Sequence, residues 1–89
     1  MGLDIIEFVM AAEKEFGLQL PDNEVSFITT VGEFTNLIHQ KLLAKYGLTP
    51  CPSNDAVFDK IKALLVKEQG LSASEIQRTS RFVQDLQMD

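Results

Sequence analysis

Apolar residues recur over the first sixteen positions of the chain with the period of an α-helix. The stripe consists of Ile5, Phe8, Val9, Ala12 and Phe16. This spacing predicts an amphipathic helix over residues 3–16. Ile6 and Met10 widen the stripe, which predicts that other elements cover the helix on more than one side. Gly17 suits the left-handed backbone that ends a helix, and Pro21 cannot continue one.

A second long helix is predicted to begin at Thr30. Thr30 and Glu33 have the spacing of a capping box, in which each side chain bonds the other residue's free amide. Gly47 marks the end of this helix after Lys45 or Tyr46. Its apolar face carries Val31, Phe34, Ile38 and Leu42, with Leu37 beside them.

A third long helix is predicted to follow a linker at residues 47–54. This linker contains two prolines, with Cys51 between them as a loop thiol without a role. Asn54 or Asp55 is expected to cap the helix, and Gly70 to end it. Phe58, Ile61 and Leu65 form its core stripe.

Two shorter segments carry apolar residues without a long period. Asp22 or Asn23 is expected to cap a brief helical turn reaching Phe27. Its apolar residues are expected to lie under the first helix: Val25, Phe27 and Ile28. After Gly70, Ser72 or Ser74 is expected to begin a single turn that buries Ile76. The expected buried residues near the end of the chain are Phe82, Val83 and Leu86.

Composition narrows the possible functions of this single small all-α domain of 89 residues. The net charge of −5 argues against nucleic acid and anionic membranes, and favours a basic protein partner. One cysteine cannot form an internal disulfide, which suits a reducing compartment, so we expect a cytoplasmic protein. We expect neither a membrane span nor a signal peptide.

Two parts of the chain resemble the acyl carrier protein family, in exchanged order. LDIIEFVMAAEKEFGLQLPD and ITTVGEFTNLI resemble the family's second to fourth helices. VFDKIKALLVKEQGLSASEI and SRFVQDLQMD resemble its first helix and long loop. The resemblance implies a circularly permuted four-helix bundle, with three main helices and one short one. Residues 1–46 then match helices two to four, residues 47–54 form the linker, and residues 55–89 match helix one and the loop. Met1 and Asp89 should lie close together.

The resemblance also indicates where a cofactor would be attached. Family members carry 4′-phosphopantetheine on a serine at the start of the second helix. Gly2 stands in that position here, with Leu3 and Asp4 after it and Asp89 before it across the exchanged junction. Glycine has no hydroxyl group, so we expect no cofactor on this chain.

Two further sets of residues take their expected roles from the resemblance. The family's acidic second helix docks basic patches of fatty-acid or polyketide synthesis enzymes and of phosphopantetheinyl transferase. The matching docking residues are Asp4, Glu7, Met10, Glu13 and Glu15, with Leu3 as a second apolar contact. The positions near the family's acyl cavity are Ala12, Leu20, Ile28, Phe34, Ile38 and Phe82. Phe34 is bulkier than the small residue often found there.

Three classes of function stay open: a carrier-type scaffold disabled at Gly2, a carrier modified at another serine, and a helical interaction module unrelated to acyl transfer. An enzyme is disfavoured because no nucleophile–base pair or metal cluster is evident. His39 lacks partners at ligand spacing, so we expect it at the surface and not in a metal site. We expect a monomer, with exchange of residues 57–89 between two chains as the alternative.

Overall fold

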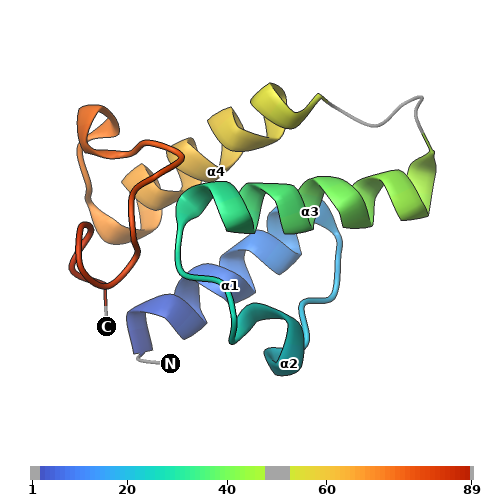
Figure 1. The fold of residues 1–89 in the computed structure, drawn as a ribbon, viewed down its shortest axis with the longest axis horizontal. Helices are drawn as coiled ribbons and strands as arrows, with labels where there is room; N and C mark the ends of the chain where they lie inside the picture. Colours follow the sequence, from blue (N-terminus) through green and yellow to red (C-terminus); the bar gives the residue numbers. More distant parts are fainter. Residues whose placement is uncertain (1–2, 48–52, 89) are drawn as a thin grey trace.

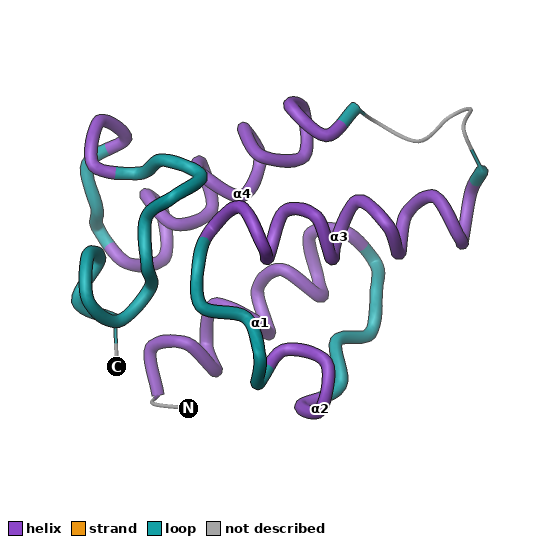
Figure 2. The backbone as a smooth tube through the Cα atoms, in the orientation of Figure 1, coloured by secondary structure: helices purple, strands orange, loops and turns teal. Residues whose placement is uncertain are grey.

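The structure is a computed structural model that describes residues 3–47 and 53–88. This part of the chain is all-α, as predicted, and contains no β-strand (Figures 1 and 2). The elements are α1 (Leu3–Phe16), α2 (Asp22–Val25), α3 (Val31–Tyr46), α4 (Asn54–Gln69) and the 3₁₀ helix η1 (Ala73–Glu75). Three helices are long and α2 is a single turn, so the predicted bundle of three main helices and one short helix is confirmed.

Helix α1 has the predicted bounds, and two interactions close its carboxyl end. Gly17 takes the left-handed conformation with φ of 64°. The amide of Leu18 donates to the carbonyl of Glu13 at 3.2 Å. The ammonium group of Lys45, at the end of α3, donates to the Gly17 carbonyl at 2.7 Å. A cation therefore lies where the helix dipole is negative.

The predicted capping box at the start of α3 is confirmed. The Thr30 hydroxyl accepts from the Glu33 amide at 3.2 Å, and the Glu33 carboxylate accepts from the Thr30 amide at 3.0 Å. The same carboxylate accepts from the amide and hydroxyl of Thr29. These bonds, with that from the Thr29 amide first, lower the pKa of Glu33 below its ordinary value of 4.5.

The predicted caps of α2 and α4 are wrong. Helix α2 begins at Asp22 after Pro21, and no side chain caps it. Ser53 caps α4, since its hydroxyl accepts from the Ala56 amide at 3.1 Å. Asn54 is therefore the first residue of the helix. Serine, asparagine and aspartate are about equally good caps, so their order along the chain does not select one.

Two apolar residues that were predicted to be buried lie at the surface. Phe27 is 81% exposed and Val83 is 57% exposed. Both lie in turns, where no helical period decides which residue faces inward. Val25 is buried and Ile28 is partly buried, as expected. Ile76, Phe82 and Leu86 are buried as predicted, and Met88, which was not predicted, is buried with them.

Helix α4 packs against both α1 and α3 and completes a single apolar core. The loop after it then crosses the amino end of α3 (Figure 1). The Val31 amide donates to the Ser80 carbonyl, and the Phe82 amide donates to the Thr29 carbonyl, each at 3.0 Å. The last third of the chain is thus held to its middle, and the loop satisfies an amide that a helix start leaves free.

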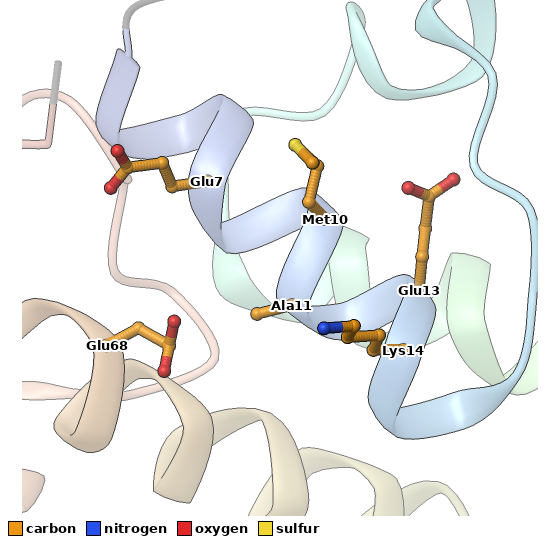
Figure 3. A pocket seen from close by; sticks show the side chains of 6 residues that line it. All are labelled: Glu7, Met10, Ala11, Glu13, Lys14 and Glu68. Carbon is orange, nitrogen blue, oxygen red and sulfur yellow. The ribbon is translucent and has the colours of Figure 1, made fainter.

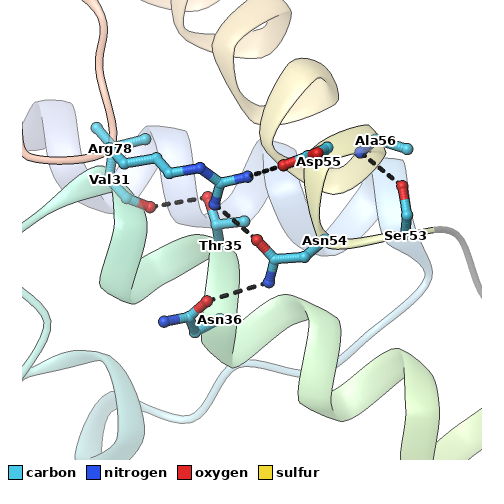
Figure 4. Close-up of polar contacts among 8 residues, drawn as sticks. All are labelled: Val31, Thr35, Asn36, Ser53, Asn54, Asp55, Ala56 and Arg78. Carbon is cyan, nitrogen blue, oxygen red and sulfur yellow. Dashed lines mark hydrogen bonds and ion pairs between the residues drawn. The ribbon is translucent and has the colours of Figure 1, made fainter.

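Arg78 joins this crossing to α4 (Figure 4). Its guanidinium donates to side-chain oxygens of Asn54 and Asp55, each at 2.6 Å, and lies 4.6 Å from the centre of the Phe58 ring. Asn54 in turn donates to the Asn36 side chain on α3 at 3.1 Å. The loop, α3 and α4 therefore meet in one polar cluster. Local sequence patterns did not indicate this cluster.

Met1 and Asp89 were expected to lie close together, but both are outside the described residues, as are Gly2 and Cys51. In Figure 1, the start of α1 and the end of the described chain lie at the same end of the bundle. The Gln69 side-chain amide donates to the Asp4 carbonyl at 3.4 Å. The carboxyl end of α4 therefore lies against the first turn of α1.

Candidate functional site

The outward side of α1 carries apolar side chains that nothing in the described structure covers. Met10 is 61% exposed and Ile6 is 42% exposed. They are one helical turn apart and so share a face. Ile6 and Met10 therefore do not extend the covered side of α1, contrary to what the widened apolar stripe had suggested. The buried face of α1 is narrower, and includes Phe8, Ala12 and Phe16.

The acidic residues around this face differ in their surroundings. Glu7 and Glu15 are exposed, whereas Asp4 and Glu13 are partly buried. Glu13 accepts a hydrogen bond from the Leu20 amide at 2.8 Å. Its carboxylate therefore holds the loop after α1 as well as contributing negative charge. Glu7 is the more accessible charge beside Met10.

A groove of about 590 Å³ runs between α1 and α4 (Figure 3). Glu68 projects from α4 toward α1, while Met10 and Glu13 point outward from α1. The groove is lined by Glu7, Met10, Ala11, Glu13, Lys14 and Glu68. Glu68 was not among the residues predicted on this surface, because helical period does not indicate which helix lies opposite.

A second hollow of about 430 Å³ also lies between α1 and α4. It adds Glu15, Leu64 and Lys67, and shares Ala11, Lys14 and Glu68 with the first groove. Carboxylates outnumber ammonium groups across the two linings. The whole surface therefore favours a cationic partner, with Lys14 and Lys67 as local exceptions.

The interior leaves little space at the predicted acyl-cavity positions. A cavity of about 10 Å³ is lined by Ile5, Phe8, Val9, Val25, Ile28, Phe34 and Phe82. Ile28, Phe34 and Phe82 were among the predicted positions. Ala12, Leu20 and Ile38 are buried but do not line this space. Phe8 also lines this cavity, although it was not among the predicted acyl-cavity positions.

The proposed attachment position, Gly2, lies outside the described residues with Asp89, and the structure describes only the backbone of Leu3. Asp4 lies in the first turn of α1. His39 is partly buried on α3. In the described ranges no three His, Cys, Asp or Glu side chains are grouped so that they could hold a metal ion. None of the described helices combines the length and apolar character that crossing a bilayer needs.

Comparisons with known proteins lead to acyl carrier proteins. Forty residues of the chain are 51% identical to an acyl carrier protein of Picosynechococcus sp., covering 45% of this chain and 49% of that protein. Over 37 residues it is 44% identical to an acyl carrier protein of Clostridium acetobutylicum, covering 42% and 48%. The chain thus spans about half the length of the curated relatives it matches. No protein-family model and no solved structure matches the chain.

The local similarity and the helical bundle agree with each other. Both relatives are named as carrier proteins. The matched stretches cover less than half of this chain.

Proposed function

We propose that this chain is an acyl-carrier-type scaffold of fatty-acid or related lipid or polyketide synthesis, which docks partner enzymes without carrying substrate. The observation that carries the proposal is Met10, an exposed apolar side chain in a groove whose lining also includes Glu7, Glu13 and Glu68. An exposed apolar residue on a predominantly acidic surface suits a partner surface with basic residues around an apolar centre. The resemblance to acyl carrier proteins supplies the class of partner.

Absence of the cofactor is the second part of the proposal. Gly2 stands where the family has its serine and offers no oxygen for a phosphodiester. Incubation with coenzyme A and a phosphopantetheinyl transferase, followed by intact-mass measurement, tests this. The chain should stay unmodified, and the Gly2→Ser variant should gain one phosphopantetheine arm. A folded but inert Gly2→Ser variant contradicts the carrier-type assignment, and an arm on the unchanged chain contradicts the scaffold role.

A permuted order of elements is the third part. Helix α4 and residues 70–88 resemble the family's first helix and long loop but follow α3 in this chain. Their packing against α1 and α3 supports this order, because one chain then contains the complete bundle. We propose a cytoplasmic monomer. Sedimentation at several concentrations measures its mass, and a mass of two chains would favour the exchanged dimer.

Docking can be tested with the same transferase as the probe. Affinity should fall steeply as ionic strength rises from about 0.01 to 1 M, because the Debye length shortens from about 30 to about 3 Å. Glu7→Lys should weaken binding at least about tenfold, equivalent to about 1.4 kcal/mol. Asp59→Lys is the matched control, because Asp59 is exposed on α4 and lines neither hollow. Equal effects of the two charge reversals would indicate a response to net charge alone.

A further inference from the structure

Three aromatic rings from separate parts of the chain meet at the centre of the bundle. Phe8 lies on α1, Phe34 on α3 and Phe82 in the loop after η1. Their ring centroids are 5.1 Å apart for Phe8 and Phe34, 5.8 Å for Phe8 and Phe82, and 6.1 Å for Phe34 and Phe82. All three distances fall in the range of favourable ring contacts. Each side chain is at most 5% exposed.

The space that the rings leave is too small for a hydrocarbon chain. The cavity beside them measures about 10 Å³, at the lower limit for a single water molecule. Apolar side chains form its remaining walls. None of the side chains that line this cavity is polar, so no side chain there would hold a water molecule in place of an apolar guest. Ring packing, and not polarity, is therefore what keeps a guest out.

Phe34 is the ring whose removal would open this space with least disturbance to the backbone. It lies in the first turn of α3, where the capping box and the amides bonded to Ser80 and Arg78 hold the helix independently of the ring. Phe82, by contrast, is part of the loop that crosses α3. Phe8 belongs to the main buried stripe of α1.

We propose that Phe34 determines the ligand specificity of the interior by closing it to hydrocarbon, including an acyl chain. The biological meaning rests on the proposed function, since it concerns the cargo of a carrier-type protein. An acyl group presented beside this chain would stay outside the bundle. Replacing Phe34 by alanine removes one phenyl group, so the void matches benzene in size and shape. Dry apolar cavities of that kind bind benzene.

Benzene titration followed by NMR of the aromatic and methyl groups tests the proposal. The unchanged chain should show no saturable shifts of its core resonances up to the solubility of benzene, whereas Phe34→Ala should show them. Phe34→Leu removes less side-chain volume, so it should bind benzene more weakly than Phe34→Ala. Phe27→Ala is the matched control because it removes an exposed ring and creates no cavity, so it should behave like the unchanged chain.

Two results would overturn the proposal. The first is saturable benzene binding in the core of the unchanged chain. The second is a folded Phe34→Ala variant that binds no benzene. If Phe34→Ala does not fold, Phe34→Leu decides: binding supports the proposal, and behaviour like the unchanged chain overturns it. Transferase docking is measured separately. If the benzene experiment fails but docking remains salt-sensitive, only the closed interior is rejected. If benzene binds as expected but docking does not depend on salt, only the proposed function is rejected.

Discussion

Substitution of Gly32 by alanine tests how closely the loop crosses α3. The close contact should make this substitution destabilising, although the same substitution in an open helix is stabilising. In an open helix, alanine in place of glycine stabilises by roughly 0.5–1 kcal/mol because it restricts the unfolded chain. At Gly32, however, an added Cβ would lie 2.8 Å from the carbonyl oxygen of Arg78 and 3.3 Å from its Cβ. Real contacts of this kind are longer, so the loop would have to move away from the helix.

The magnitude follows from the contacts that this movement disturbs. Overpacking of a tight site costs about 1–3 kcal/mol. The bond from the Gly32 amide to the Arg78 carbonyl, now 2.7 Å, would also lengthen, and such a bond contributes about 0.5–1.5 kcal/mol net. After subtraction of the helix-propensity gain, the cost centres on about 2 kcal/mol, and we expect Gly32→Ala to reduce the free energy of unfolding by about 1–3 kcal/mol.

Urea unfolding followed by circular dichroism measures this change. With a slope near 1 kcal/mol/M, the urea concentration at the midpoint should fall by roughly 1–3 M at unchanged slope. Gln40→Ala, at an exposed position of the same helix, is the control and should stay within about 0.5 kcal/mol. If Gly32→Ala is neutral or stabilising, the close approach does not constrain the fold and the reasoning is refuted.

Three other substitutions should give measurable effects. Gln87 has a left-handed backbone with φ of 56°, so Gln87→Gly should stabilise by about 1 kcal/mol in urea unfolding; destabilisation would contradict this. The lowered pKa of Glu33 means that its carboxylate stabilises the fold above its unfolded-state pKa. That contribution is lost as the pH falls through the folded-state pKa. Glu33→Gln should therefore be less stable than the unchanged chain at neutral pH, and it should lose less stability than the unchanged chain on acidification. Arg78→Lys keeps the charge but loses the planar guanidinium that bonds two side chains and stacks on Phe58, so it should lower the thermal midpoint, whereas an unchanged midpoint would show that charge alone suffices.

Much of the fold was predictable from the sequence because its signals are local. The bounds of α1 follow from a helical period and a glycine stop, both readable within twenty residues. The start of α3 follows from Thr30 and Glu33, which lie three positions apart and bond each other. Prediction failed where local signals were equivalent, as at the cap of α4, or where no period exists, as at Phe27.

The candidate site was predictable only in part. The resemblance to acyl carrier proteins supplied the acidic residues of α1 as candidates, and Glu7 among them is exposed. Period alone did not reveal that Glu13 is bonded to the Leu20 amide, nor that Glu68 of α4 lies across the groove. Both facts depend on how distant segments pack.

By itself, the sequence determined the three long helices, the glycines that end them and the acidic character of α1, since each depends on neighbours a few positions apart. Only the tertiary structure decided that Phe8, Phe34 and Phe82 close the interior and that Arg78 joins the crossing loop to α4. These contacts join residues 20 or more positions apart. Helical periodicity specifies which face of a segment is apolar but not which other segment covers it.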